Sequence, residues 1–235
     1  MKNPDDKKKF VQSKFSAISG KYDFLNSILS MQIDRYWRWV TTRELKEFPE
    51  GAVLDLCAGT LPLALELTRQ APKRLVLAVD FTENMLRAGV KSLPDDNRKD
   101  RIGPVCGDGE QIPVKDNSVW GVTVAFGVRN LARTQQGLDE MCRVLKPSGK
   151  LLILEFSRPK NFIIKPLYTF YLNKVLPKVA GLVSGDKEAY EYLASSIAEF
   201  YEPAELLGMM KKAGFAETYC RPLTFGIVTV YVGVK

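Results

Sequence analysis

The chain has 235 residues, 46% of them hydrophobic, and its 34 Lys and Arg against 27 Asp and Glu give a formal net charge of +7. This length predicts one large domain, with or without a lid, and the charge fits nucleic acid, an anionic membrane or acidic ligands. The sequence contains no histidine, which disfavours Ser-His-Asp hydrolysis and zinc chemistry, so we expect no metal.

Residues 1–48 are predicted to form an N-terminal helical cap. Apolar residues recur near helical spacing in this region, with breaks near Gly20 and Asp34. Lys7 to Lys9 lie in a polar segment that does not resemble a secretory signal, and we expect them in solvent. The cap has too few apolar residues for a core of its own, so it should pack on residues 49–235.

From Gly51 onward, short apolar runs alternate with helical patterns. Strands are predicted at 53–57, 75–80, 103–106, 119–126 and 150–156, and helices at 61–70, 83–93 and 134–145. Such alternation is typical of a parallel sheet whose strands are joined by right-handed helical crossovers. The chain is therefore predicted to be an α/β protein.

The last third of the chain has a different pattern. Residues 157–201 contain prolines and many aromatic side chains but no strand pattern, which predicts a helical lid inserted after the fifth strand. A last helix at 203–213 precedes two strand-like runs, near 215–220 and 226–234. We expect these runs to form an antiparallel hairpin with its turn at Arg221-Pro222.

Polar and small residues follow the first three predicted strands. The turn at 57–60 has one glycine, Gly59, so the three-glycine dinucleotide fingerprint is absent, although small residues still let a ligand approach the backbone. Asp80 ends the second strand, where a carboxylate can accept both ribose hydroxyls, and Asp108 could accept from an adenine amino group. Each feature alone is common in turns, but together at one sheet edge they favour an S-adenosylmethionine site.

Several blocks of the sequence resemble the UbiE/MenG family of quinone C-methyltransferases, from about residue 13 to the end of the chain. The most specific blocks are Phe126-Gly127-Val128-Arg129-Asn130 and Leu154-Glu155-Phe156-Ser157, and others lie at 21–26, 35–38, 143–147, 190–197 and 225–227. The resemblance implies a Rossmann-like class I methyltransferase fold, with a seven-stranded, mostly parallel sheet and an antiparallel terminal strand. The implied reaction transfers the methyl group of S-adenosylmethionine to a ring carbon of a reduced quinone precursor, demethylmenaquinol being preferred, and leaves S-adenosylhomocysteine.

The resemblance also implies the residues of the site. Those expected to bind the cofactor are Asp55, Gly59, Thr60, Asp80, Phe81, Met85, Asp108, Gly109 and Ala125. The catalytic candidates are Arg129, Asn130 and Tyr22, and Arg129 could stabilise a developing phenolate by lowering the pKa of a substrate hydroxyl. Asp34, Tyr168 and Tyr192 are substrate candidates, although the two tyrosines could be core aromatics, and for Asp34 we favour a cap on a helix that begins at Arg35.

The turn after the first strand departs from the family pattern. Gly59-Thr60-Leu61-Pro62 stands where the family usually has Gly-Thr-Gly-Asp. We expect Leu61 to bring a branched side chain to the methionine end of the cofactor and Pro62 to remove an acid, so that the site is reshaped or weakened. This change keeps open a divergent enzyme that acts on another prenylated or polycyclic phenol, or that uses the cofactor for non-methylating chemistry.

A non-catalytic quinone-binding or scaffold protein is a further alternative. Nucleic acid is disfavoured as a partner, because no Asn-Pro-Pro-Tyr-like block follows the fourth strand.

The four cysteines are widely spaced without a CxxC pair, which favours a reduced, cytoplasmic protein. The apolar lid residues are interleaved with lysines, so they could form a tunnel for a prenylated quinol substrate, with peripheral contact at the inner face of the cell membrane. They could equally pack the lid on the domain, and both could hold. A homodimer is left open.

Overall fold

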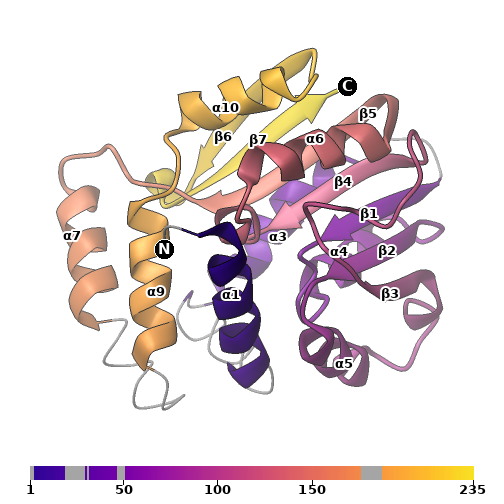
Figure 1. Ribbon diagram of the computed structural model, residues 1–235, viewed down its shortest axis with the longest axis horizontal. Coiled ribbons are helices and arrows are strands. Elements are labelled where there is room, and N and C mark those ends of the chain that lie inside the picture. Colours follow the sequence, from indigo (N-terminus) through magenta and orange to yellow (C-terminus); the bar gives the residue numbers. More distant parts are fainter. Residues whose placement is uncertain (1–2, 19–29, 31, 47–50, 176–186) are drawn as a thin grey trace.

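The computed structural model describes residues 3–18, 30, 32–46, 51–175 and 187–235 (Figure 1). In these residues, seven strands form one sheet with the order β3-β2-β1-β4-β5-β7-β6. The strands are β1 (Ala52–Leu56), β2 (Leu75–Asp80), β3 (Ile102–Cys106), β4 (Val119–Ala125), β5 (Leu145–Phe156), β6 (Glu217–Leu223) and β7 (Val228–Val234). Strands β1 to β5 are parallel, whereas β7 is antiparallel to both β5 and β6. The predicted sheet is confirmed.

The predicted turn at Arg221-Pro222 is wrong, because both residues belong to β6 and pair with Val230 and Thr229 of β7. The turn lies three residues later, at the short 3-10 helix η4 (Thr224–Gly226). Proline is tolerated in β6 because this strand is at the edge of the sheet, where a missing N–H donor leaves no neighbouring strand unpaired.

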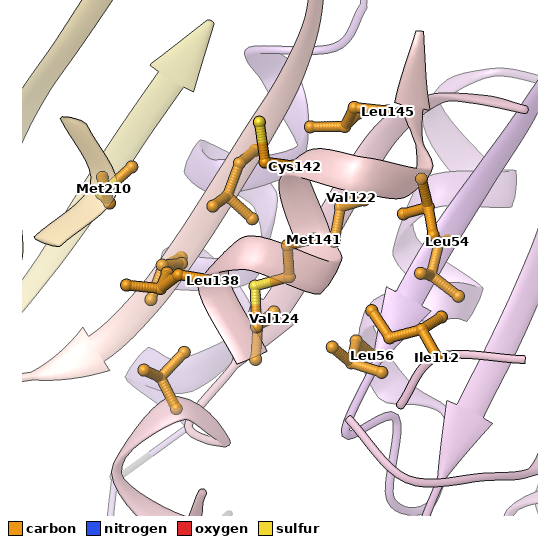
Figure 2. Close-up of a cluster of buried hydrophobic side chains, with 14 of the residues drawn as sticks. Leu54, Leu56, Ile112, Val122, Val124, Leu138, Met141, Cys142, Leu145 and Met210 are labelled. Carbon is orange, nitrogen blue, oxygen red and sulfur yellow. The ribbon is translucent and has the colours of Figure 1, made fainter. Parts of the chain in front are cut away.

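Helices cover both faces of the sheet and bury two apolar layers (Figure 1). One layer lies under α6 (Thr134–Val144) and α10 (Pro203–Lys212). Figure 2 shows side chains of this layer, where Leu138 and Met141 of α6 meet Leu56 and Val124 of the sheet. The other layer lies under α3 (Ile33–Arg43), α4 (Pro62–Gln70) and α5 (Glu83–Ser92). Both faces of the parallel strands are thus buried, as their near-continuous apolar runs require.

The regions predicted to be a cap and a lid contain helices among the described residues. The cap contains α1 (Pro4–Ile18) and α3, and the lid contains α7 (Ile164–Phe170), the π-helix η3 (Tyr171–Val175) and α9 (Lys187–Ala198). In Figure 1, α9 lies between α7 and α1. The predicted break at Gly20 lies outside the described residues. None of the described helices has the length and apolar character to cross a membrane.

Short 3-10 helices precede β3 and follow β4. They are η1 (Lys99–Arg101) and η2 (Val128–Asn130). The second of these holds the catalytic candidates Arg129 and Asn130, and it contacts α1, α9 and β5. The cap and the lid therefore meet at the loop that follows β4.

Candidate functional site

A pocket opens at the carboxyl ends of β1, β2 and β4, where the strand order reverses and ligands of open α/β sheets usually bind. The space between its walls is about 750 Å³ when the open mouth is included. Eight predicted site residues line it: Gly59, Asp80, Phe81, Met85, Asp108, Gly109, Ala125 and Asn130. The structure therefore brings together most of the expected cofactor residues.

The Asp80 carboxylate is fixed at the end of β2 by two main-chain donors. Its Oδ2 accepts the N–H of Gly59 at 2.8 Å, and its Oδ1 accepts the N–H of Thr82 at 2.7 Å. Burial raises the pKa of Asp80, while the hydrogen bonds from Thr82 and Gly59 oppose that shift. The Thr82 side chain also bonds to this carboxylate. Because each carboxylate oxygen has two lone pairs, Asp80 keeps capacity to accept a further hydroxyl group.

The ends of β1 and β4 approach each other with strained backbone. Cys57 and Phe126, which follow these strands and line the pocket, have left-handed φ angles of +55° and +58°. Such conformations cost about 1–3 kcal/mol in non-glycine residues and cluster at functional sites. A Cβ on Gly127 would lie 2.4 Å from the Cys57 Cβ, so only glycine permits this approach. The residues after β1 and β4 therefore lie close together where they line the pocket.

The expectation that Leu61 crowds the cofactor site is wrong. Leu61 and Pro62 are not among the lining residues, and the Leu61 side chain is completely buried. With its φ of +69°, Leu61 directs its side chain toward α5, where a Cβ on Gly89 would lie 2.8 Å from the Leu61 Cγ. Pro62 begins α4, where its fixed φ is favourable. The altered turn thus changes the α4–α5 packing and leaves the pocket wall intact.

Asp55 and Thr60 are expected cofactor residues that do not line the pocket. Asp55 is buried within β1, where its Oδ1 accepts a hydrogen bond from Thr123 Oγ1 at 3.0 Å. Desolvation by burial raises the pKa of Asp55 to about 7. Leu56 and Cys57, which follow Asp55 in the chain, line the pocket instead. Asp55 therefore lies beneath the turn, and Thr60 is likewise buried.

The cap supplies a pocket wall that was not expected. Lys8, Val11 and Phe15 of α1 line the pocket, and their spacing of i, i+3 and i+7 places them on one helical face. The Lys8 Nζ lies 2.6 Å from Asp108 Oδ2 and 2.8 Å from Glu110 Oε2. The prediction of a solvated lysine segment is therefore wrong for Lys8, although the helical spacing of these residues was visible in the sequence.

Hydrogen bonding outweighs burial at the Lys8 ion pairs. Burial lowers the pKa of Lys8, but its bonds to Asp108 and Glu110 raise that pKa above its ordinary value overall. Burial raises the pKa of Glu110, but bonds from Lys8 and from the main-chain N–H groups of Arg133 and Ala132 lower it overall. Both groups are thus stabilised in their charged forms beside the pocket.

Three further side chains of α1 hold this helix in place. The Lys7 Nζ donates to the carbonyl oxygens of Arg129 and Leu131, at 3.0 and 2.8 Å, so Lys7 is also not solvated. Gln12 donates to the carbonyl of Phe81, and the Phe10 ring meets the Tyr192 ring edge-on, with centroids 5.3 Å apart. We call Lys7, Lys8, Phe10 and Gln12 the α1 clasp.

The catalytic candidates lie at different depths. Arg129 is buried, with its Nη1 2.8 Å from Glu155 Oε1, and it also donates to the Phe126 carbonyl. Its guanidinium lies 5.6 Å from the centre of the Phe156 ring. Asn130 lines the pocket, whereas Arg129 is behind it. Tyr22 lies outside the described residues.

The two lid tyrosines that were predicted to contact substrate, Tyr168 and Tyr192, have different surroundings. The Tyr192 hydroxyl donates to Asn130 Oδ1 at 3.1 Å. Tyr168 of α7 is buried, and its hydroxyl has no hydrogen-bond partner among the described residues. Burial raises the pKa of Tyr168, and the nearby positive charge of Arg129 opposes that rise. Tyr192 thus contacts the pocket residue Asn130 directly, whereas neither Tyr168 nor Tyr192 lines the pocket itself.

The cap role predicted for Asp34 is wrong. Helix α3 begins at Ile33 after Gln32, so Asp34 lies in the first turn. Its carboxylate accepts a hydrogen bond from Ser30 Oγ at 2.7 Å and forms an ion pair with Arg38. Asp34 is buried and is not among the pocket residues, so its polar groups are already used within the cap.

The side chains of the pocket suit a nucleoside that carries a positive charge. Asp80 and Asp108 offer carboxylate oxygens, and Phe81, Met85 and Leu131 offer apolar surface for a ring. This set fits S-adenosylmethionine, whose hydroxyl and amino groups donate and whose sulfonium is cationic. In the described part of the chain, no group of three His, Cys, Asp or Glu side chains is placed to hold a metal ion, and a metal-free site stays a prediction.

Comparisons with known proteins agree with this geometry. The model of the ubiE/COQ5 methyltransferase family matches residues 1–235. A ubiquinone/menaquinone biosynthesis C-methyltransferase UbiE of Geotalea daltonii is 41% identical over 226 residues, 96% of each chain. A demethylmenaquinone methyltransferase of Porphyromonas gingivalis is 41% identical over 96% of this chain and 92% of its own length. The crystal structure of a SAM-dependent methyltransferase of Thermotoga maritima has a TM-score of 0.67 and 20% identity, and covers 95% of this chain and 99% of its own. That likeness shows the class I methyltransferase fold.

Proposed function

The chain belongs to the ubiE/COQ5 methyltransferase family, and on this premise we propose that it methylates a ring carbon of a reduced, prenylated quinone precursor, using S-adenosylmethionine. Demethylmenaquinol is the preferred substrate, because a relative with 41% identity is named a demethylmenaquinone methyltransferase. The observation that carries the proposal is the pocket at the strand ends, where Asp80, Asp108 and Asn130 come together.

The cofactor side of the pocket is formed by β2, β3 and the turn after β1. S-adenosylmethionine supplies an electrophilic methyl group on a sulfonium when it is bound. Asp80 would accept the ribose hydroxyls, and Asp108 would accept from the adenine amino group, while Gly59 leaves the backbone open to close approach. Lys8 balances the negative charge of Asp108 and Glu110, so the carboxylates do not repel one another.

The substrate side would lie at η2, which lines the pocket through Asn130 and contacts the lid helix α9. A hydroquinone carbon becomes nucleophilic when the neighbouring hydroxyl loses its proton, and a nearby cation favours that loss by lowering the hydroxyl pKa. Arg129 supplies the cation, and Glu155 and the Phe126 carbonyl fix its orientation. Asn130, held by Tyr192, would orient the quinol oxygen, and Tyr168 offers a second hydroxyl donor. Positioning of the two reactants would provide much of the acceleration.

The finding at Leu61 favours this reaction over the divergent alternatives. A changed reaction was considered because the turn after β1 departs from the family pattern, yet that change is buried between α4 and α5. The pocket keeps the carboxylates, the small residues and the Asn130 side chain that methyl transfer requires. A scaffold protein that binds no cofactor would not require these carboxylates, small residues and Asn130 in one pocket.

The test is methylation by the purified chain. The protein, S-adenosylmethionine and a short-chain demethylmenaquinol are incubated under reducing conditions, and mass spectrometry is expected to detect one added methyl group. Asp80→Asn, which keeps the size of the side chain, should weaken cofactor binding about 100-fold, as expected for a buried charge-assisted contact of roughly 3 kcal/mol. Absence of calorimetric heat and of thermal stabilisation at saturating cofactor would instead support a scaffold.

A further inference from the structure

An apolar patch is exposed on the segment that enters and forms α7. Phe162 is 82% exposed, Leu167 and Phe170 are each 62% exposed, and Ile163 is 54% exposed. Large apolar side chains scattered singly on a surface need no explanation, but a contiguous group marks an interaction site. Ile163, Leu167 and Phe170 follow the spacing i, i+4 and i+7, which places them on one face. We call Phe162, Ile163, Leu167 and Phe170 the α7 patch.

The charge around the α7 patch has one sign. Residues 156–175 contain four basic residues and no acidic residue. One of the four, Arg158, pairs with Glu202, whereas Lys160 and Lys165 are exposed beside the patch. Apolar side chains interleaved with lysines are the pattern of segments that lie in the interface of an anionic membrane.

The opposite side of α7 is buried against the protein. Tyr168 is the buried residue of this helix, and it lies near enough to Arg129 for that charge to affect its pKa. One short helix thus presents an inward hydroxyl and an outward apolar face. A prenyl chain that leaves the site along α7 would pass from protein into lipid without crossing water.

We propose that the α7 patch docks on an anionic phospholipid surface, with Lys160 and Lys165 at the head groups and the four apolar side chains in the interface. A protein partner is disfavoured, because lysine is depleted in protein–protein interfaces, whereas lysines flank this patch. The proposal extends the proposed function to the place where its substrate is collected, but docking does not depend on catalysis.

The first test measures vesicle binding of the full chain by sedimentation. Phosphatidylcholine vesicles with and without phosphatidylglycerol are compared, and binding is expected only when phosphatidylglycerol is present. Phe162→Ser with Leu167→Ser should reduce the bound fraction at least tenfold. Leu75→Ser is the matched control, because Leu75 is 56% exposed at the amino-terminal end of β2, away from the pocket. Equal losses in both variants, or no binding of the unmodified chain, would overturn the proposal.

A second test separates docking from catalysis and from self-association. Methylation of a water-soluble, short-chain quinol should be unchanged in the Phe162→Ser, Leu167→Ser variant, while its vesicle binding is lost. If the unmodified chain binds vesicles but methylates no quinol, the docking surface stands and the proposed function fails. If the same variant changes the sedimenting mass of the free protein, the patch joins copies of this chain and the lipid proposal is wrong.

Discussion

Helices α1 and α7 both flank the carboxyl end of the sheet, but they are attached in opposite ways. The lysine-rich α1 turns Lys7 and Lys8 inward, onto carboxylates and carbonyl oxygens of the strand ends. Helix α7 buries one side chain, Tyr168, and exposes Leu167 and Phe170, and the two residues before the helix, Phe162 and Ile163, are exposed as well. Composition would assign the first helix to solvent and the second to the core. The comparison indicates that the polar or apolar character of the neighbouring sheet edge, and not the composition of the helix, decides which side chains of the helix are buried.

The strand ends explain why α1 is the inward helix. Parallel strands present polar loops and carboxylates at their carboxyl ends, and Asp108 and Glu110 add two negative charges there. Buried charges need partners, so lysine is the side chain that this edge accommodates. Among the described residues, the outer face of α7 is exposed at Leu167 and Phe170, and these apolar side chains are left for another surface.

The largest expected effect is at Arg129 of η2, the short helix that α1 and α9 both contact. The double variant Arg129→Met, Glu155→Gln removes the cation without leaving a buried unpaired carboxylate, which would cost about 3–5 kcal/mol. We expect turnover to fall by roughly 100-fold or more, the size typical of a lost electrostatic contact to the transition state. Cofactor affinity should stay close to that of the unmodified chain, because Arg129 does not line the pocket.

The control for this experiment is Glu155→Gln alone. With its partner neutral, Arg129 exerts a stronger positive field, so the acid limb of the pH–rate profile should move to lower pH. A merely structural Arg129 would leave that limb in place. If the double variant loses no more turnover than Glu155→Gln, the electrostatic role of Arg129 is wrong.

The next effect concerns the α1 clasp. Lys8→Met removes both ion pairs and should raise the dissociation constant of S-adenosylmethionine about tenfold, or about 1.4 kcal/mol, because the helix that forms one pocket wall is held less firmly. Lys9→Met is the matched control, since Lys9 is exposed on the same helix. Calorimetric titration measures both. The same affinity in the two variants would show that the clasp does not contribute to cofactor binding.

A smaller effect is expected at the inward side of α7. Tyr168→Phe removes a buried hydroxyl that has no described partner, and such groups cost about 1–3 kcal/mol. Thermal stability should therefore stay the same or rise, while the KM for the quinol rises several-fold. Tyr231→Phe, in β7, also removes a buried hydroxyl and should leave the KM unchanged. A fall in stability without a change in KM would make Tyr168 a core residue.

The smallest expected effect is the pH dependence of the stability with which α1 and α7 are held on the rest of the protein. The pKa of Glu110 is lowered in the folded chain, so its contribution to stability is present above the ordinary carboxyl pKa and is lost as pH falls through the folded value. The α1 clasp should loosen in acid by about 1 kcal/mol, whereas α7 has no ion pair to lose among the described contacts. Amide protection factors near pH 3 and pH 6 measure this, with Lys8→Met as the control. An equal loss of amide protection in α1 and α7 would contradict the claim that ion pairs hold α1 but not α7.

Much of the fold was predictable because parallel strands buried on both faces are continuous apolar runs. The runs at β1 and β2 and the acid at Asp80 were enough to locate the pocket. The predictions that were wrong concerned residues whose position depends on local backbone geometry or on contacts with residues far away in the sequence. Leu61 was misplaced because its left-handed φ decides where its side chain points. Lys8 was missed because its partners lie about a hundred residues away.

The α1 clasp also determines when the pocket can form during synthesis of the chain. Lys8 and Asp108 are separated by 100 residues, and Lys7 and the Leu131 carbonyl by 124. At about 5–20 residues per second, a ribosome needs roughly 6–25 seconds to add the latter segment. During that interval α1 has no acidic strand ends to dock on, and the charges of Lys7, Lys8 and Lys9 keep the waiting segment hydrated. The nascent chain would thus complete the wall of its cofactor site only after most of the sheet has been made.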